Sequence, residues 1–268
     1  ICGRVGILEF ELIKYLKKNF NTLAYSINDS ILIYHEQASI FKRLRLIIYK
    51  FQVRQNICKK IFVSGTVSKN TLIKDGVKKD KIIISGLPRF KKYFNKSMNG
   101  TVKNAFPKIL VLTGAHEWNG YHKWQEDQNE FLFKLDCLNI KNVIINIKPH
   151  PRDNFEFNQL SKLNILDKEV NIDRAIQEHD IVICATSLST ALMQAGLLNK
   201  KTLFINTRDL SYLMDSYDYY ISNFPTISKT ELVADFYKKA LKNNANVLDK
   251  FISKKSLYST EIILNEIT

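Results

Sequence analysis

The stretch that most constrains the fold is residues 143–152, an apolar run of β type that stops abruptly at Lys-Pro-His-Pro-Arg. β-Branched residues fill most positions of 143–147, which is typical of a parallel strand buried on both faces. Two prolines then end the strand and stiffen the turn around His150. Since ligands of open α/β sheets bind outside the carboxyl ends of the strands, Lys148, His150 and Arg152 suit a phosphate or diphosphate. The alternative is a Pro-rich turn with solvated cations.

Comparable runs recur along the chain and alternate with segments of helical periodicity. The predicted strands are 22–26, 31–34, 60–65, 81–86, 108–114, 143–147, 180–185 and 201–206, and the predicted helices include 7–19, 68–76, 128–138, 172–179 and 191–198. The end of the chain, 229–242 and 247–265, is also predicted to be helical. Such alternation predicts parallel sheets covered by helices.

Residues 91–106 lose this periodicity and gain Asn, Ser, Gly and Lys. We therefore predict an α/β fold of two Rossmann-like, doubly wound domains: a partial domain at 1–92, a linker at 93–106, and a second domain at 107–268 that includes the terminal helices. The first domain has too few predicted strands to be complete. The chain begins at Ile1 without an initiator methionine, so we expect it to be part of a longer one.

The formal net charge is +14, from 40 Lys and Arg against 26 Asp and Glu. Such an excess suits nucleic acid, an anionic membrane surface or an anionic small substrate. No signature of a nucleic-acid-binding module occurs, so the sequence favours the last two partners over nucleic acid. Residues 40–58 interleave apolar and basic residues at helical intervals. They are expected either to lie on a membrane or to pack on the sheet with their cations in water.

The four cysteines, Cys2, Cys58, Cys137 and Cys184, lie far apart and lack the spacing of a metal site. They predict reduced, mostly buried thiols. No apolar run is long enough to span a bilayer. The expected location is therefore the cytoplasm, with peripheral contact to the inner face of the membrane as a further expectation.

Chemically useful side chains follow several predicted strands. In the first domain these are His35 and Glu36, and Arg89 after a Gly-Leu-Pro turn. Either His35 or Glu36 can accept the proton of an acceptor hydroxyl near neutral pH. A structural pair at a strand end and a plain surface arginine are the alternatives.

In the second domain a cluster of hydroxyl side chains opens a predicted helix. Hydroxyls and the free N–H groups of a first helical turn form an anion site that the helix dipole favours. Simple N-capping by Ser187 or Ser189 is the alternative. The loop after the first strand of this domain adds two candidates, His116 and Glu117. The hydroxyl cluster consists of Thr186, Ser187, Ser189 and Thr190.

Several enzyme classes lack their motifs here. The chain contains no P-loop, no G-x-G-x-x-G dinucleotide fingerprint, no G-x-S-x-G and no cluster of metal ligands. This disfavours a kinase, a dehydrogenase and a serine hydrolase. We expect no metal and no cofactor.

Together these motifs resemble the GT-B glycosyltransferase-like superfamily, above all bacterial capsule and teichoic-acid-type transferases. Residues 61–65 and 81–90, with Gly86-Leu87-Pro88-Arg89, look like the end of the acceptor domain of those enzymes. Lys148-Pro149-His150-Pro151 resembles their His-Pro motif, also found in sialyl- and Kdo-transferases, which contacts the nucleotide phosphate. Residues 185–192 are similar to their Ser/Thr-rich phosphate loop. The resemblance covers roughly residues 30–210.

Two departures bear on the donor. The teichoic-type enzymes carry His-Gly where this chain has His35-Glu36, and Asp-Tyr-Ser-Ser at 185–189. These differences favour a sugar nucleotide, above all a CMP-sugar, over a glycerophosphate donor, and CDP- or UDP-linked donors are alternatives. UDP-N-acetylglucosamine 2-epimerases share the fold and a His/Glu-bearing loop near the same place. The acidic and arginine pattern that follows that loop in them is not evident here.

The resemblance implies metal-independent, inverting transfer of a sugar from a nucleotide donor to a surface glycan or lipid-linked acceptor, in bacterial polysaccharide biosynthesis. His35 or Glu36 would be the catalytic base, and Arg89 with the Lys148–Arg152 and Thr186–Thr190 loops would bind the donor. One alternative is a nucleotide-sugar 2-epimerase of the same fold. Another is a non-catalytic, membrane-associated subunit.

Overall fold

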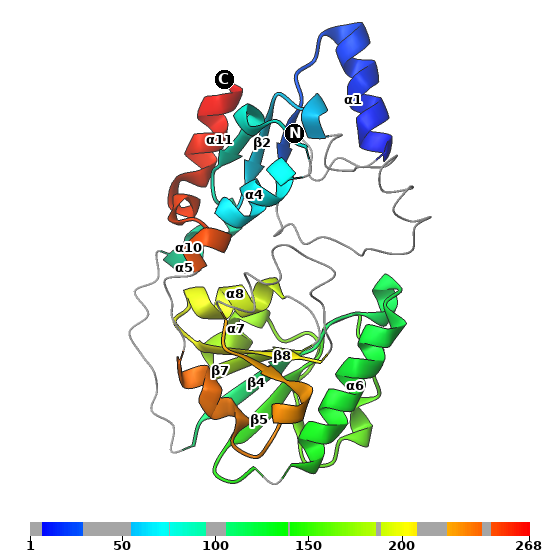
Figure 1. The fold of residues 1–268 in the computed structure, drawn as a ribbon, viewed down its shortest axis with the longest axis vertical. Coiled ribbons are helices and arrows are strands. Elements are labelled where there is room, and N and C mark those ends of the chain that lie inside the picture. Colours follow the sequence, from blue (N-terminus) through cyan, green and yellow to red (C-terminus); the bar gives the residue numbers. More distant parts are fainter. Residues whose placement is uncertain are drawn as a thin grey trace. The chain divides into compact units, whose positions relative to one another are not determined.

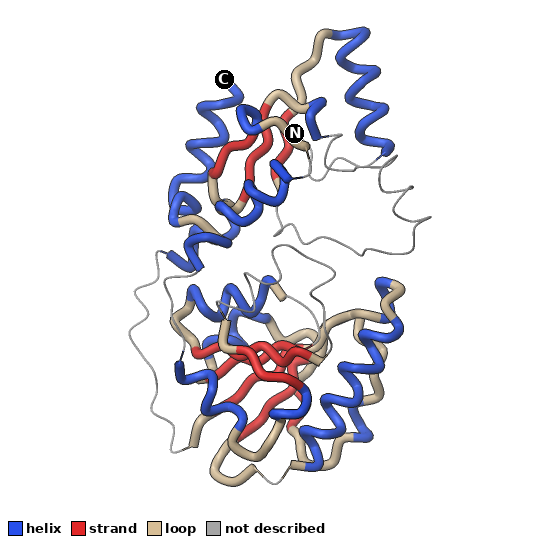
Figure 2. Tube along the Cα trace, viewed as in Figure 1, coloured by secondary structure: helices blue, strands red, loops and turns tan. Residues whose placement is uncertain are grey.

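The computed structural model describes residues 7–28, 55–74, 76–94, 106–138, 140–185, 189–207, 224–242 and 248–268. They form two compact units, each built around its own parallel sheet (Figures 1 and 2). The first unit holds the described residues of 7–94 and 248–268, and the second those of 106–207 and 224–242. The α/β class with parallel sheets is confirmed. The predicted strand 31–34 and most of the basic segment 40–58 lie outside the described residues.

The first unit has a three-stranded sheet in the order β1-β2-β3. Ile13, Ile61 and Leu72, from a helix, a strand and a second helix, form its core on one face. Its strands are β1 (Tyr25–Ile27), β2 (Lys60–Val63) and β3 (Ile82–Ile84); its helices before the linker are α1 (Ile7–Phe20), α4 (Thr66–Lys74) and α5 (Lys91–Phe94), with 3-10 turns η1 (Gln55–Ile57), η2 (Lys79–Lys81) and η3 (Pro88–Phe90).

The terminal helices belong to the first unit, so the expectation that all of 107–268 forms the second domain is wrong for 248–268. α10 (Leu248–Phe251), η10 (Lys254–Tyr258) and α11 (Ser259–Ile267) make up this segment. Ile263 of α11 packs with Phe62 of β2. Sequence order cannot reveal this return, because the contact joins residues that are far apart in the chain.

At Gly86 the terminal segment packs closely on the loop that follows β3. The Gly86 φ of +68° is left-handed, and a Cβ there would lie 2.3 Å from the backbone nitrogen of Ser256. The Ser256 hydroxyl in turn accepts a hydrogen bond from the backbone N–H of Leu87 at 3.0 Å. The Gly-Leu-Pro turn predicted to lead into a cleft is therefore also a docking point for the C-terminal segment.

The predicted linker 93–106 begins inside a helix. Tyr93 lies in α5, is buried, and its ring centroid is 5.9 Å from that of Phe90. Because the periodicity is lost after residue 91, the sequence did not predict the short helix α5, which packs on the first unit. Residues 95–105 lie outside the described part of the chain.

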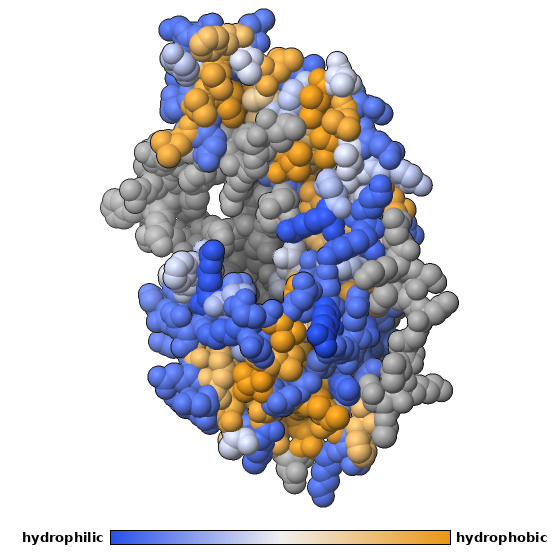
Figure 3. Space-filling model, turned by 180° about the vertical axis from the view of Figure 1, so that it is seen from behind, coloured by the Kyte–Doolittle hydropathy of each residue, from blue (hydrophilic) through white to orange (hydrophobic). Residues whose placement is uncertain are grey.

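Several apolar side chains of α1 are exposed in the first unit. Leu8 is 83% exposed and Phe20 is 67% exposed. Figure 3 shows hydrophobic surface on the part of the first unit that holds α1. Among the described helices, none is both long and apolar enough to cross a bilayer.

The second unit has a six-stranded parallel sheet in the order β6-β5-β4-β7-β8-β9. Chain order runs outward from β4 on one side and from β7 on the other, which is the doubly wound arrangement. The strands are β4 (Lys108–Leu112), β5 (Ile144–Lys148), β6 (Asn164–Ile165), β7 (Ile181–Ala185), β8 (Lys201–Asn206) and β9 (Thr226–Ser228). Two of them, β6 and β9, were not predicted from the sequence, because they are short edge strands.

Helices cover both faces of this sheet (Figure 1). Val111 and Ile147 pack on Leu132 of α6 and on Phe236 of η8, which share one face. The helices of this unit are α6 (His122–Cys137), α7 (Ile172–Gln177) and α8 (Thr190–Leu197), with 3-10 helices η4 (Glu117–Asn119), η5 (Phe157–Gln159), η7 (Lys229–Glu231) and η8 (Phe236–Lys242). α6 starts six residues before the predicted 128, inside the aromatic stretch that had appeared irregular.

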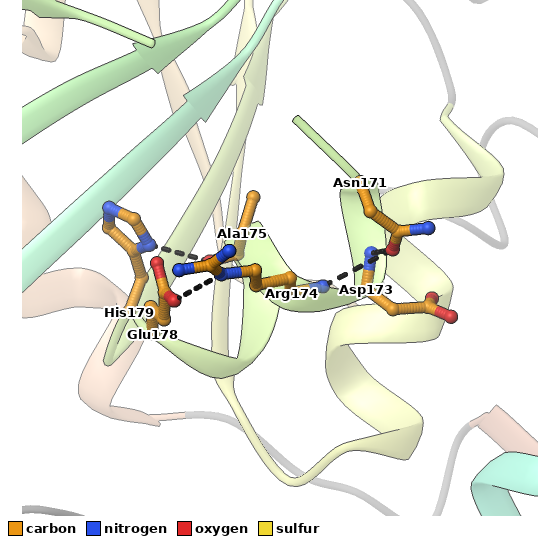
Figure 4. Close-up of polar contacts among 6 residues, drawn as sticks. All are labelled: Asn171, Asp173, Arg174, Ala175, Glu178 and His179. Atoms are coloured by element: carbon orange, nitrogen blue, oxygen red, sulfur yellow. Dashed lines mark hydrogen bonds and ion pairs between the residues drawn. The ribbon is translucent and has the colours of Figure 1, made fainter. Parts of the chain in front are cut away.

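A buried histidine ties the end of α7 to the sheet. His179 is 3% exposed, and its Nδ1 donates to the carbonyl of Ala175 at 2.6 Å (Figure 4). Its Nε2 is therefore left to accept from the Asn146 side chain of β5 at 2.7 Å. The Asn146 oxygen accepts in turn from Asn164 of β6 at 2.8 Å. This chain of hydrogen bonds satisfies polar groups in the middle of an otherwise apolar layer.

His179→Leu should destabilise the protein by about 2 kcal/mol, because it removes two hydrogen bonds and leaves the buried Asn146 amide unpaired. Arg174→Ala is the matched control at the same helix end. Arg174 and Glu178 form an exposed pair in Figure 4, so its removal should leave the denaturation midpoint nearly unchanged. Urea unfolding of both variants measures this. Equal midpoints for the two variants would contradict the network.

Candidate functional site

The sheet order places the candidate site at the carboxyl ends of β4, β5 and β7. β4 pairs with β5 on one edge and with β7 on the other, all parallel. The chain reverses its direction of winding between β4 and β7, and ligands of doubly wound sheets bind in the crevice at this switch point. The loops that follow these strands therefore decide what the second unit can bind. Of the loop after β7, residues 186–188 lie outside the described residues.

The loop after β4 buries a histidine against a glycine. His116 is 5% exposed, and a Cβ on Gly114 would lie 2.6 Å from its Nε2. The imidazole also meets the edge of Trp124 of α6, with ring centroids 5.8 Å apart. Any larger residue at 114 would have to displace the ring.

His116 Nε2 is buried and has no hydrogen-bond partner among the described residues. Burial, helped by the charge of His150, lowers the pKa of His116 to about 4, although Asp153 and Asp127 act in the opposite direction. The ring is therefore neutral at pH 7. A neutral imidazole nitrogen can donate or accept a hydrogen bond, so the loop after β4 holds one uncommitted polar group where a ligand is expected.

A buried carboxylate joins the loop after β5 to α6. Asp153 is 1% exposed, and its oxygens accept from Gln125 at 3.1 Å and Gln128 at 3.2 Å. They also accept from the backbone N–H of Phe155 at 3.1 Å. Gln128 continues the network by accepting from the Gly114 N–H at 2.7 Å. The Asp153 carboxylate, through the two glutamines of α6, thus connects the loop after β4 with the loop after β5.

Lys148 takes a structural position. It is 5% exposed, and its ammonium donates to the carbonyls of Pro149 at 2.9 Å and Lys168 at 2.7 Å. Loss of hydration lowers the pKa of Lys148, while Glu169 and Asp167 act in the opposite direction. Lys168 returns a bond from its own ammonium to the Asp153 carbonyl at 2.6 Å. These hydrogen bonds connect the turn after β5 to Lys168.

His150 and Arg152 lie at the surface of the same turn. The Arg152 N–H donates to His150 Nδ1 at 3.1 Å, so the neutral ring carries its proton on Nε2. Partial loss of hydration, aided by Arg152 and Lys148, lowers the pKa of His150 although Asp153 raises it. The Arg152 guanidinium lies over the Trp118 ring, 5.3 Å from its centroid. The loops after β4 and β5 therefore touch at the surface as well as inside.

α8 begins after β7 with Ser189 as its N-cap. The Ser189 hydroxyl accepts from the Ala191 N–H at 3.1 Å, so the expected capping is present. The N–H of Ser189 approaches the thiol of Cys184, which is fully buried, and burial raises the pKa of that thiol to about 12. The thiol is therefore not a nucleophile. Thr190 opens the helix, whose first N–H groups lie at the carboxyl edge beside β4.

The predicted site residues divide into three groups. His116 and Glu117 after β4, His150 and Arg152 after β5, and Ser189 and Thr190 after β7 share one edge of the second sheet. Arg89 belongs to the first unit, where it is exposed and its guanidinium lies 4.8 Å from the Phe90 ring centroid. His35, Glu36, Thr186 and Ser187 lie outside the described residues.

Sequence reasoning missed Asp153 and its two glutamine partners. A signal was present, because Gln125 and Gln128 are three residues apart and so share one face of a helix. Asp153 directly follows the Lys148–Arg152 turn. The helix start at 122 was needed to see that the two amides face this carboxylate.

No family model matches the chain, and no curated protein matches it. Its structure does match solved structures of two-unit α/β enzymes. The UDP-GlcNAc 2-epimerase of Methanocaldococcus jannaschii, in complex with UDP-GlcNAc and UDP, has a TM-score of 0.58 at 14% identity, over 95% of this chain and 79% of that one. The enzyme of Neisseria meningitidis bound to UDP-GlcNAc has a TM-score of 0.58 at 13% identity, over 98% and 76%. The wall teichoic acid polymerase TagF has 0.50 at 13%, over 98% and 71%.

These matches establish the fold. The chain has the GT-B-like architecture of Rossmann-type α/β units that the sequence predicts. At such identities they do not test the Lys148–Pro151 motif or the role of any residue.

Asp153→Ala should cost about 3 kcal/mol of stability, because three buried donors lose their acceptor. Asp153→Asn should also destabilise, since its NH₂ group would face donors. Asp167→Ala is the control: this exposed carboxylate accepts from the Glu169 N–H and should cost less than about 1 kcal/mol. Urea denaturation compares the three. A cost at 153 no greater than at 167 would show that the network does not hold the loops.

The pH dependence of stability should report on His116. Its pKa falls from 6.5 to about 4 on folding, so the neutral ring stabilises the folded state above pH 6.5. This stability is lost as pH falls from about 6.5 to about 4, because only the unfolded chain binds the proton there, and amounts to about 3 kcal/mol. His116→Phe should remove this part of the slope, and the lowered pKa values of His150 and His179 leave the remainder. Identical slopes for the two proteins would refute the assignment.

Proposed function

We propose that this protein is an enzyme that acts on a nucleotide-activated sugar, and that the second unit binds the donor. The observation that carries the proposal is His116, a buried neutral histidine with an unpartnered Nε2 beside the switch point of a doubly wound sheet. A buried polar atom without a partner is costly, so a ligand that bonds to it contributes to affinity. Solved structures of the same fold bind UDP or UDP-GlcNAc, which supports a nucleotide ligand.

The donor phosphates would lie at the start of α8. The positive end of the helix dipole lies there, and the hydroxyls of Ser189 and Thr190 add donors, while the Ala191 N–H is already bonded to the Ser189 hydroxyl. Thr186 and Ser187 precede them in the same loop. His116 Nε2 is buried beside Gly114, so it would donate to a phosphate oxygen, in one neutral tautomer, once the ligand opens the loop after β4.

His150 would supply a second imidazole from the loop after β5. Its Nε2–H is free to donate outward because Nδ1 already accepts from the backbone. Lys148 acts differently from the sequence-based expectation in this proposal: its ammonium is used by two carbonyls, so it supports the turn instead of binding phosphate directly. Arg152 remains a candidate for anion binding at the surface.

The reaction we favour is transfer of the sugar to a glycan or lipid-linked acceptor, with inversion. The acceptor oxygen forms a bond to the anomeric carbon, the bond from that carbon to the phosphate oxygen breaks, and the acceptor proton passes to a base. His35 or Glu36 is proposed as that base, and Arg89 as a further donor contact. Positioned hydrogen-bond donors can stabilise the departing phosphate. A CMP-sugar remains the favoured donor, with CDP- and UDP-sugars as alternatives.

A 2-epimerase of a nucleotide sugar is the second candidate. The match to the epimerases, with TM-scores of 0.58, exceeds that to TagF at 0.50. Epimerisation requires the same donor site and no acceptor. A role in polysaccharide or capsule biosynthesis, a cytoplasmic location and peripheral membrane contact go with the transferase proposal.

A panel of CMP, CDP, UDP and GDP at a concentration near 100 times Kd should raise the melting temperature by about 5–10 °C for the matching nucleotide. His116→Phe should weaken that nucleotide by at least about tenfold, since a buried hydrogen bond to a charged group is lost. The control is His122→Phe, an exposed histidine at the start of α6. A panel without any shift, or equal affinity in both variants, would refute the site.

Transfer and epimerisation are then separated by incubating the matching sugar nucleotide alone. A donor that keeps its configuration at C2 and is consumed only when a glycan acceptor is added supports transfer. Conversion to the C2 epimer without acceptor supports the second candidate and overturns the first. Chromatography with NMR of the sugar ring distinguishes the two products.

A further inference from the structure

Trp118 is a large apolar side chain exposed to water at the carboxyl edge of the second sheet. It lies in η4, after β4, and is 62% exposed. The other tryptophan of the chain, Trp124, stacks on Tyr121 with ring centroids 4.8 Å apart. The indole is exposed at the carboxyl end of a parallel strand, which is where binding residues concentrate.

Arg152 from the neighbouring loop lies against this indole. Its guanidinium carbon is 5.3 Å from the Trp118 ring centroid. Among the described residues, no carboxylate or carbonyl accepts a hydrogen bond from the guanidinium. The backbone N–H of Arg152 donates to His150. The cation therefore keeps its fork of N–H donors available while the ring holds it in place.

The backbone around both side chains is fixed before any ligand arrives. Gly120, with φ of +79°, closes η4, and its N–H donates to the Glu117 carbonyl at 2.8 Å. The Tyr121 N–H donates to the His116 carbonyl at 2.9 Å. On the other loop, the Asp153 N–H donates to the His150 carbonyl at 2.9 Å. A preorganised pair loses little entropy when it binds.

The pair lies on the opposite side of β4 from the start of α8. Trp118 contacts Arg152 after β5, whereas α8 follows β7, and β5 and β7 border opposite edges of β4. Since neighbouring strands are about 5 Å apart, β5 and β7 are about 10 Å apart. His150, which we assign to the donor, lies in the same turn as Arg152, so the pair borders the donor site and would bind a group beyond the phosphate at α8.

We propose that Trp118 and Arg152 form a subsite for a sugar ring that carries a negative charge, contributed by the acceptor. The C–H face of a pyranose would pack on the exposed indole, and the guanidinium would bind the carboxylate or phosphate of the same sugar in a bidentate manner. The net charge of +14 favours the approach of such an acidic saccharide. This inference rests on the proposed function, and it adds the chemical class of the acceptor.

Intrinsic fluorescence tests the subsite directly, because the chain has only two tryptophans. The probes are tri-galacturonic acid and its methyl ester, which differ only in the charge of the carboxyl groups. Tri-galacturonic acid should quench or blue-shift the emission of the wild type, and this change should be absent in Trp118→Phe, which retains Trp124. The ester should bind at least about tenfold more weakly.

Arg152→Gln should remove the preference for the acid over the ester while its circular dichroism spectrum stays that of the wild type. Raising the salt concentration should weaken the acid and not the ester, since only the former bond is ionic. Equal binding of acid and ester to the wild type, or no change in emission with either, would overturn the proposal. A change of Trp118 emission caused by the nucleotide alone would also overturn it, by assigning the indole to the donor.

The two levels of inference fail separately. The nucleotide panel is read by melting temperature in wild type and Trp118→Phe, and the same shift is expected in both, because Trp118 is not part of the proposed phosphate site. If nucleotide binds and the acidic saccharide does not, the subsite is refuted and the donor site stands. If the saccharide binds and no nucleotide does, the donor site is refuted.

Discussion

The pairing of β4 with β5 on one edge and β7 on the other is the constraint on which the second unit depends. It makes β4 a central strand and forces the chain to wind outward in both directions. The crossovers must then put α6 on one face and α7 and α8 on the other. The crevice between the carboxyl ends of β4 and β7 is a geometric consequence of this winding. Every candidate group of the second unit acquires its place from that reversal.

Polar groups at this edge are arranged so that few charges are buried. Asp153 and Lys148 are the buried charges described at this edge. The Asp153 carboxylate accepts from two glutamine amides and a backbone N–H. The Lys148 ammonium donates to two carbonyls. The cation with free donors at this edge, among the described residues, is then Arg152 at the surface, which is why it can serve a second ligand group.

The sequence predicted what depends on local pattern. The β-branched runs at 108–114, 143–147, 180–185 and 201–206 each contain a parallel strand, because such runs have few other stable environments, although β5 is exposed where it begins at Ile144. It failed where the outcome depends on distant partners. The terminal helices return to the first sheet through Ile263 on Phe62, and nothing in the local pattern of 248–268 distinguishes the two sheets.

The same limit explains the site. A Lys-Pro-His-Pro-Arg turn gives its residue types but not their directions, so Lys148 and Arg152 were equal candidates although one ammonium points inward and one guanidinium outward. Asp153 was missed because the role of a carboxylate depends on its hydrogen-bond partners, which here are two side-chain amides of α6. The choice between transfer and epimerisation has a similar origin. The two reactions make the same demand on the proposed donor site, and they differ in whether an acceptor binds next to the sugar. The Trp118–Arg152 pair is the place in the second unit that we assign to an acidic acceptor, so binding of an acidic saccharide there would favour transfer over epimerisation.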